Sequence, residues 1–396
     1  MFINEEMYGL GSCRSVIREL FEYGKKRAAE IGKENVYDFS LGNPSIPAPD
    51  IVNETIRTLT QEMNSLSLHG YTSAQGDAET RAAVAEYLNK THGTDFTADN
   101  FYMTMGAAAS LSICFKALTC TPDDEIVVIA PFFPEYSVFI KAAGAKCVMV
   151  PPDTENFQIR FDELEKLINS NTKAVVINSP NNPSGAVYSE DTIKKLAAVL
   201  SEKSKEFGNP IFIIADEPYR EIAYDVDVPF VTKYYDNTLV CYSYSKSLSL
   251  PGERIGWVLV PNAAQDSDRL YAAVAGAGRA LGYVCAPSMF QKVIARCIGN
   301  TGDVEAYRQN RDILYDGLTK IGYHCYKPEG AFYMFVKALE EDSDAFSEKA
   351  KAEDILVVSA KGFGCPGWVR ISYCVDKAMI ERSLPAFERL YQKYKD

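Results

Sequence analysis

Short apolar runs that end in polar or glycine-rich turns recur between residues 100 and 260, and they constrain the fold more than any other feature. They include DEIVVIAPFFPEY, KAVVINSPNNPSG, PIFIIADEPY and TLVCYSYSK. Helical stretches such as SEDTIKKLAAVLSEKSKEFG separate several of them, with a serine that can cap the helix start and a glycine that can end it. Apolar strands that alternate with helices predict a mostly parallel sheet covered by helices on both faces. We therefore expect an α/β fold.

The chain is long enough for two domains. It has 396 residues, of which 47% are hydrophobic, so it can bury a large core. We predict an N-terminal arm with part of a small domain over residues 1–45, a large domain over 46–290, and a smaller α+β domain over 291–396.

Composition argues against several classes of protein. The net charge of −12 disfavours a nucleic-acid partner, because phosphate contacts need concentrated Lys and Arg. No apolar run reaches the roughly 18 residues of a membrane span, and the first ten residues carry glutamates where a signal peptide carries lysines. The ten cysteines form no C-x-x-C pair, which indicates buried thiols of a reducing compartment and no metal site. We expect a cytoplasmic protein with small-molecule partners.

Unusual residues follow the predicted strands, at the sheet edge where ligands gather in such folds. The glycine turn and helix start in MTMGAAAS can hold a phosphate, or form a tight turn with nothing bound. Phe133 can stack on a flat ligand or belong to the core, and turn chemistry alone can explain the asparagines of NSPNNPSG. Asp216 can cap the next element or meet a positively charged group.

The stretch SYSKSLSLPGERIGW surrounds Lys246 with hydroxyls and places Arg254 eight positions later. A lysine desolvated at a sheet edge has a lowered pKa and becomes a nucleophile that can form a Schiff base. Ser243, Ser245, Arg254 and the helix start after Gly106 together suit one phosphate. A flat heterocycle with an aldehyde, a phosphate and a protonatable nitrogen is pyridoxal 5'-phosphate. If Lys246 and Arg254 were ordinary exposed charges on a surface loop, each of them could be explained by itself. That explanation does not account for all five of the unusual strand-end motifs together.

These motifs resemble the class I aminotransferases, a family of fold type I pyridoxal-phosphate enzymes that includes the aspartate aminotransferases. The resemblance covers nearly the whole chain, and SYSKSLSLPGERIGW matches its S-x-S-K-x-x-x-x-x-G-x-R-x-G signature. It implies that Lys246 is the Schiff-base lysine, that Asp216 pairs with the pyridinium nitrogen, and that Phe133 stacks on the ring. The resemblance assigns Asn182 and Tyr219 to the phenolic oxygen of the ring. It assigns the phosphate to the amides of Ala107 and Ala108 and to the side chains of Ser243, Ser245 and Arg254.

The resemblance also implies a homodimer with shared active sites, because Tyr71 matches a tyrosine that reaches the phosphate of the other subunit. Gly42 and Arg370 match residues that bind the α-carboxylate of the substrate, although a structural ion pair also explains an arginine in an apolar strand. By the same resemblance, Phe133 and Asn182 also contact the substrate. The predicted catalytic residues are Lys246, Asp216 and Tyr219. Alanines in MGAAAS and the pair Ala360-Lys361 depart from the family pattern. Whether Arg279 reaches the neighbouring active site stays open.

We therefore expect an aminotransferase that moves an amino group from an L-amino acid, with aspartate slightly favoured, to a 2-oxo acid by a ping-pong mechanism. Lys246 would act as general base. A pyridoxal-phosphate-dependent C–S β-lyase of the same fold is the main alternative, and a non-enzymatic ligand-sensing regulator is a weaker one. The sequence lacks the dinucleotide-binding fingerprint that a nicotinamide-dependent dehydrogenase needs. The glycines of AGAGRALG lie in an alanine-rich helical pattern and do not follow a strand, which favours close helix packing.

Overall fold

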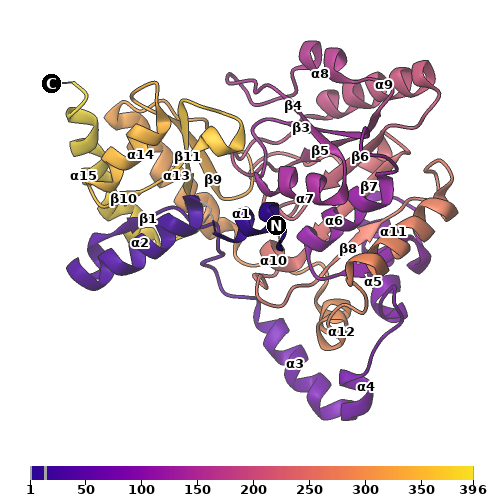
Figure 1. The fold of residues 1–396 in the computed structure, drawn as a ribbon. Helices are drawn as coiled ribbons and strands as arrows, with labels where there is room; N and C mark the ends of the chain where they lie inside the picture. The colour runs from indigo at the N-terminus through magenta and orange to yellow at the C-terminus, as the bar shows by residue number, and fades with distance from the viewer. Residues whose placement is uncertain (1, 13–15, 396) are drawn as a thin grey trace. The chain divides into compact units, whose positions relative to one another are not determined.

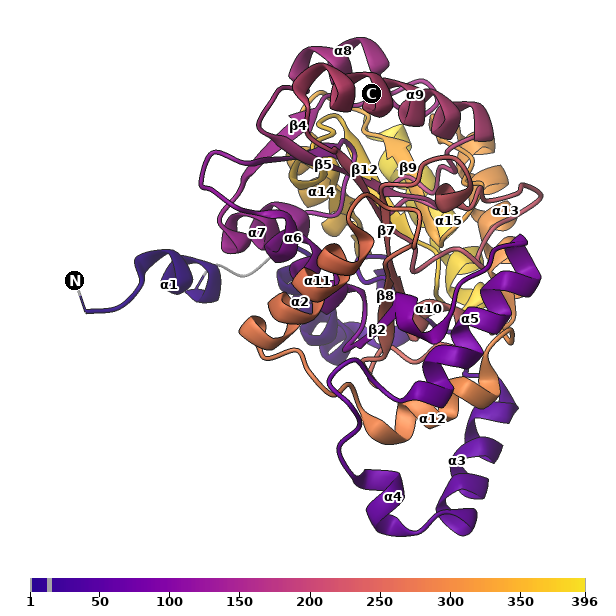
Figure 2. The ribbon, with the colours of Figure 1, turned by 90° about the vertical axis from the view of Figure 1, so that its right-hand side faces the viewer.

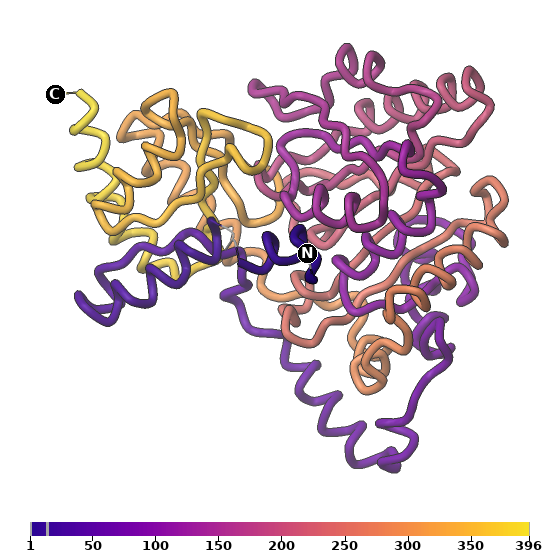
Figure 3. Tube along the Cα trace, viewed as in Figure 1, coloured from indigo at the N-terminus to yellow at the C-terminus, as the bar shows by residue number. Residues whose placement is uncertain are grey.

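The computed structural model describes residues 2–12 and 16–395. The chain divides into two compact units. Unit 1 comprises residues 1–45, 305–328 and 332–396, and unit 2 comprises residues 46–304 and 329–331. Figure 3 traces the chain through both units.

Unit 2 is built on one large sheet with helices packed against it (Figure 1). Its strands are β2 (Phe101–Thr104), β3 (Glu125–Ile129), β4 (Lys146–Val150), β5 (Thr172–Asn178), β6 (Phe212–Asp216), β7 (Thr238–Ser243) and β8 (Gly256–Leu259). Its helices are α3 (Asp50–Glu62), α4 (Ser65–His69), α5 (Ala78–His92), α6 (Ala107–Leu118), α7 (Glu135–Ala143), α8 (Phe161–Leu167), α9 (Glu190–Phe207), α10 (Tyr244–Ser247), α11 (Ser267–Leu281) and α12 (Ser288–Cys297).

The seven strands follow the order β2-β8-β7-β6-β5-β3-β4. Strands β3 to β7 pair in parallel, whereas β8 is antiparallel to both of its neighbours, β2 and β7. The expected mostly parallel α/β sheet is therefore confirmed. Because β5, β6 and β7 run in parallel, their carboxyl ends lie side by side: Asn178 is opposite Asp216, and Asp216 is opposite Cys241.

Alternate residues of the strands enter two different cores, which is why the strands read as continuous apolar runs. Val175 and Ile213 belong to one core, together with residues of α5, α9 and α12. Val176 and Ile214 belong to the other, together with residues of α6, α7 and α11. Both faces of the sheet are thus covered, as Figure 2 shows from a second side.

The helix ends follow local sequence signals. Ser189 caps α9 by accepting a hydrogen bond from the amide of Thr192, and Gly208 ends it with a φ of 71°. Both ends match the prediction. The glycines of AGAGRALG lie within α11 as expected, and a Cβ at Gly278 would collide with the hydroxyl of Tyr102. Arg279 is exposed on the same helix.

Unit 1 is a smaller α+β layer. It contains a three-stranded antiparallel sheet, β11-β12-β9, and a two-stranded parallel pair, β1-β10. Its strands are β1 (Tyr37–Asp38), β9 (Tyr333–Lys337), β10 (Ile355–Leu356), β11 (Val358–Ser359) and β12 (Trp368–Ser372). Its helices are α1 (Glu5–Ser12), α2 (Val16–Ile31), α13 (Val304–Ile321), α14 (Ser343–Lys351) and α15 (Lys377–Gln392).

The compact units do not follow the expected boundary at residue 290 closely. Helix α12 belongs to unit 2 because it packs against α3 and α5, and the change of unit comes at Val304. The division into domains at residues 45 and 290 stays a prediction.

The lack of a side chain at Gly256 lets β8 lie close to β7 and to the turn before α6. A Cβ at this position would overlap the carbonyl oxygen of Tyr242 and lie 3.1 Å from the Cα of Gly106. Both obstacles are backbone atoms, so relief requires a shift of β7 or of the turn before α6. We expect Gly256→Ala to destabilise the protein by about 1–3 kcal/mol, as overpacking typically does.

Denaturant unfolding of Gly256→Ala and of a matched control, Gly252→Ala, checks this expectation. A Cβ at Gly252 would meet nothing within 4 Å. Equal stability of the two variants would show that the backbone around Gly256 yields without cost.

Candidate active site

Asp216 is the last residue of β6 and is 5% exposed. Its Oδ2 accepts a short hydrogen bond from the hydroxyl of Tyr136, and the side-chain amide of Asn178 lies 3.5 Å from the same oxygen. Its Oδ1 is buried and has no hydrogen-bond partner among the described residues. One oxygen of the carboxyl group is therefore held by the protein, and the other is left for a donor that the chain does not supply.

Burial is the main influence on the ionisation of Asp216. Desolvation raises the pKa of this carboxyl to about 7, the Tyr136 hydrogen bond lowers it, and the charge of Glu217 raises it further. A buried carboxylate is costly unless it meets a positive group. The site thus favours a cationic hydrogen-bond donor at Oδ1.

The NSPNNPSG segment forms a rigid turn beside Asp216. The side chain of Asn181 accepts hydrogen bonds from the amide and the hydroxyl of Ser184, at 3.0 and 2.7 Å. The backbone amide of Asn182 donates to the side chain of Asn178 at 2.7 Å. Turn chemistry accounts for Asn181 and Ser184, as the sequence reasoning allowed, whereas the side chain of Asn182 is held 7% exposed by its neighbours.

Lys246 lies in α10, directly after the carboxyl end of β7. Its Nζ lies 5.8 Å from the ring centroid of Tyr219, a residue that is 4% exposed in the turn after β6. The structure therefore brings together two of the predicted catalytic side chains from neighbouring strands. The lysine is half-buried.

A cluster of hydroxyls and one guanidinium faces the start of α6. The hydroxyls of Ser243 and Ser245 lie 2.7 Å apart, and Arg254 donates to the hydroxyl of Ser245 at 3.2 Å. A Cβ at Gly106 would lie 2.7 Å from a terminal nitrogen of Arg254, so the guanidinium reaches the helix start.

Within α6, the first amide with an intrahelical bond is that of Ala109, so the amides of Ala107 and Ala108 precede it at the positive end of the helix dipole. Together, these two amides, the hydroxyls of Ser243 and Ser245 and the guanidinium of Arg254 are suited to bind an anion with several oxygens.

Phe133 is partly buried in the segment before α7. Its ring packs edge-on against Tyr136, with centroids 5.7 Å apart and an angle of 85° between the planes. The predicted stacking residue thus lies next to the tyrosine that donates to Asp216.

Arg370 and Gly42 lie together in unit 1. Arg370 is a residue of β12, is 2% exposed, and donates to the carbonyl of Ser40 at 2.6 Å. Its guanidinium lies over the rings of Tyr333 and Phe363, at 4.7 and 5.0 Å from the centroids. A Cβ at Gly42 would overlap the hydroxyl of the same tyrosine. The guanidinium thus contacts two aromatic faces and a backbone carbonyl.

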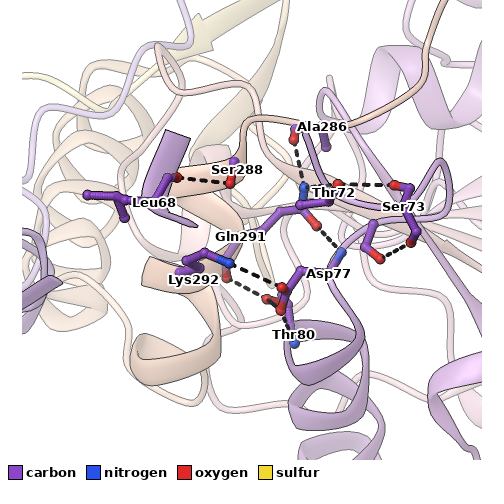
Figure 4. A network of polar contacts seen from close by, with 10 residues as sticks. Leu68, Thr72, Ser73, Asp77, Thr80, Ala286, Ser288, Gln291 and Lys292 are labelled. Carbon is purple, nitrogen blue, oxygen red and sulfur yellow. Dashed lines mark hydrogen bonds and ion pairs between the residues drawn. The ribbon is translucent and has the colours of Figure 1, made fainter. Parts of the chain in front are cut away.

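Tyr71 is 96% exposed, on a segment that side chains of α12 anchor (Figure 4). Gln291 accepts from the amide of Asp77 at 2.6 Å, and Ser288 donates to the carbonyl of Leu68 at 2.9 Å. Lys292 pairs with the carboxylate of Asp77 at 3.1 Å. The network fixes both ends of the segment, so that Tyr71 projects from a well-supported loop.

Two residues that the sequence reasoning did not select belong to this site. Tyr136 and Asn178 both contact the carboxylate of Asp216. Asn178 carries a usable signal, because it is the polar end of an apolar strand adjacent to β6. Tyr136 reads as an ordinary core aromatic, and only the packing of α7 brings it to Asp216.

Among the described residues, no group of His, Cys, Asp and Glu side chains could hold a metal ion. A separate search of the described helices finds none with the length and apolar character required to cross a bilayer.

Comparison with known proteins gives consistent matches along the chain. The family model of aminotransferase class I and II matches residues 33–387. A crystal structure of an aminotransferase from Eubacterium rectale is 73% identical, covers 100% of both chains and superposes with a TM-score of 0.99. The aspartate aminotransferase of Pyrococcus horikoshii is 30% identical over 95% of this chain and 94% of its own length. A probable N-acetyl-LL-diaminopimelate aminotransferase of Bacillus subtilis is 29% identical over 92% and 91%.

Asp216 should make the stability of the cofactor-free protein depend on pH. Its pKa is about 7 in the folded protein, against an ordinary value of 3.8, so the folded state holds a proton that the unfolded chain releases between these values. Stability therefore falls as pH rises through this window, and the loss is complete above about pH 7. Asp216→Asn removes the ionisable group and therefore this loss of stability, which amounts to about 1.4 kcal/mol for each pKa unit between the folded and unfolded values.

We expect the stability advantage of Asp216→Asn over the unmodified protein to grow from about 1 kcal/mol near pH 4.5 to about 4 kcal/mol near pH 8.5. Urea unfolding of cofactor-free protein measures it, with Asp236→Asn at an exposed position as the control. An advantage that does not change with pH would show that Asp216 is not the titrating group.

Proposed function

Because the chain belongs to the class I and II aminotransferases, we propose that it transfers an amino group from an L-amino acid to a 2-oxo acid in a ping-pong reaction with pyridoxal 5'-phosphate. The buried, unpartnered Oδ1 of Asp216 carries this proposal. A protonated ring nitrogen is the positive donor that this oxygen lacks, and its arrival would offset the desolvation that raises the pKa of the carboxyl.

The remaining residues of unit 2 suit the other parts of the same cofactor. The hydroxyls of Ser243 and Ser245, the guanidinium of Arg254 and the amides of Ala107 and Ala108 offer donors to a phosphate. Phe133 offers a ring face, and Asn182 and Tyr219 offer donors to a phenolic oxygen. We assign Lys246 as the residue that attaches the cofactor covalently.

The chemistry divides between the cofactor and the chain. When bound, pyridoxal phosphate accepts the electrons released as the Cα–H bond of the substrate breaks. Once the amine of the substrate has replaced Lys246 on the cofactor, the freed lysine amine would serve as the general base for the Cα proton and would donate that proton again later in the reaction. Asp216 holds the proton on the ring nitrogen. Arg370 would bind the α-carboxylate with its guanidinium fork, and the backbone of Gly42, whose lack of a side chain leaves room for the Tyr333 hydroxyl, would meet the same carboxylate.

Aspartate is our favoured amino donor. Relatives from Thermotoga maritima, Pyrococcus horikoshii and Bacillus subtilis carry the name aspartate aminotransferase, at 28%, 30% and 27% identity. A C–S β-lyase is the competing activity, and the requirement for a 2-oxo acid acceptor separates the two.

We further propose a cytoplasmic homodimer with shared active sites. The exposed ring of Tyr71, on its anchored loop, supports a contact with the phosphate of the partner subunit. The described cysteines are all free thiols, which supports a reducing compartment.

A half-reaction screen tests the proposed reaction. The visible absorbance of the cofactor-loaded protein is followed as each amino acid is added without an acceptor, and we expect aspartate to bleach it fastest. Lys246→Ala should abolish both the absorbance and turnover, while Lys203→Ala, at a partly exposed position of α9 where the lysine pairs with Glu206, should change neither. Release of pyruvate and ammonia from cystathionine without an acceptor would instead identify a lyase.

Arg370→Lys tests the carboxylate-binding role. The variant keeps the charge but loses the bidentate fork, which is worth about 1.5–3 kcal/mol and thus about 10–150-fold in affinity for the amino acid. We expect the KM for the amino donor to rise by this factor. Arg311→Lys is the matched control, because Arg311 is also buried in unit 1 but donates to the carbonyl of Pro328 and pairs with Asp312. It should lower stability without raising KM, and equal effects of the two changes on KM would contradict the role of Arg370.

A further inference from the structure

A small pocket lined by aromatic and aliphatic side chains and by three charged ones lies next to the residues that carry the proposed chemistry. The residue after Asp216 is Glu217 and the residue after Lys246 is Ser247, and both line this pocket of about 20 Å³. Arg220 and Glu221 line it as well. Its volume suits a single water molecule, so it is not a substrate site. Its interest lies in the charges that it holds beside Asp216.

Arg220 and Glu217 form a two-pronged ion pair in this pocket. The Nε of Arg220 donates to Oε2 of Glu217 at 2.6 Å, and a terminal nitrogen lies 2.5 Å from Oε1. The two side chains are 9% and 3% exposed. The remaining donors of Arg220 bind the carbonyls of Val228 and Pro229, at 3.1 and 3.2 Å. The guanidinium is thus fixed on every side.

The ring of Phe230 contacts both Arg220 and His92. The guanidinium lies 5.0 Å from the ring centroid of Phe230, and His92 stacks on the same ring at 4.2 Å. Burial, and then the positive charges of Arg220 and Lys233, lower the pKa of His92 to about 4. His92 is therefore neutral at neutral pH, and Arg220 is the cation of the described pocket that balances Glu217.

The ionisation of Asp216 depends on the net charge of the Glu217–Arg220 pair. Charge on Glu217 opposes ionisation of the neighbouring carboxyl in a medium of low dielectric constant. Other titratable groups lie around Asp216, Glu217 and Arg220: Tyr87 of α5, Tyr136 of α7, Tyr219, Glu221, Cys241 and Tyr242 of β7, and Tyr244 and Lys246 of α10. Burial raises the pKa of Tyr136, Cys241, Tyr242 and Glu221, so these groups favour their neutral forms.

We propose that Arg220 is a positioning residue of the transamination site, which neutralises Glu217 and thereby keeps Asp216 anionic and able to hold a protonated ring nitrogen. The inference rests on the proposed function, because it concerns the same cofactor. It assigns to the Glu217–Arg220 pair an electrostatic role in addition to fixing the turn after β6. Loss of Arg220 would leave an uncompensated negative charge beside Asp216, whereas loss of Glu217 would leave a positive one.

The test compares three variants with opposite charge imbalances. Arg220→Met leaves Glu217 unpaired, Glu217→Gln leaves Arg220 unpaired, and the double variant removes both charges. Three quantities are measured for each: the dissociation constant of pyridoxal phosphate from cofactor-free protein, the pH dependence of the visible absorbance of loaded protein, and kcat and KM separately. Urea unfolding shows which variants are folded.

For Arg220→Met we expect cofactor binding and kcat to fall on the order of tenfold near neutral pH, with KM for the amino donor nearly unchanged. The absorbance transition should move to higher pH, and binding should recover at about pH 9 as Asp216 ionises. Glu217→Gln should keep cofactor affinity although it lowers stability. The double variant should return both the dissociation constant and kcat to within about threefold of the unmodified protein.

A purely structural role predicts a different pattern. Arg220→Met and the double variant would then lose cofactor affinity and kcat to the same extent at every pH. That result would overturn the proposal. Should Arg220→Met not fold, loss of cofactor affinity in Glu217→Gln would overturn it by itself. Failure of the unmodified, loaded protein to transaminate would count against the proposed function, whereas the ratios between variants in cofactor affinity test Arg220 separately.

Discussion

The candidate site of unit 2 depends on one constraint: the carboxyl group of Asp216 is buried, and one of its oxygens has no hydrogen-bond partner among the described residues. Asp216 lies at the end of a strand whose two faces are both covered by helices, and desolvation is the largest influence on its pKa. Tyr136 and Asn178 supply donors to one oxygen only. Burying such a group is unfavourable unless a positive partner arrives, so the geometry is organised for a ligand rather than for the stability of the empty fold.

The backbone around the site explains why so many donors converge there. Parallel pairing brings the ends of β5, β6 and β7 to one edge, so that Asn178, Asp216 and Ser243 follow from topology alone. The antiparallel strand β8 then returns beside β7, and the absence of a side chain at Gly256 lets it pass close to Gly106. The start of α6 and the Ser243–Ser245 pair thereby meet Arg254, which combines a helix dipole, hydroxyls and a guanidinium at one anion site.

Sequence patterns recover what is local and periodic. The apolar runs predict the sheet and its two covered faces, Ser189 and Gly208 mark the ends of α9, and the spacing from Ser243 to Arg254 identifies one side of the site. The antiparallel direction of β8 is not encoded in its own residues, because an apolar run reads the same in either direction. Tyr136 is missed for a similar reason: its contact with Asp216 arises from the docking of α7 and not from any local spacing.

The charged side chains of the two candidate binding regions have different partners. In unit 2, Glu217 is balanced by Arg220, which leaves Asp216 available for a cationic ring. In unit 1, the guanidinium of Arg370 lies over two aromatic rings and donates to a backbone carbonyl. In the function that we propose, these residues hold the cofactor and the α-carboxylate, and other side chains select the substrate. Relatives named for aspartate and for N-acetyl-LL-diaminopimelate are similar to this chain to nearly the same degree, 30% and 29%, as such a division of labour predicts.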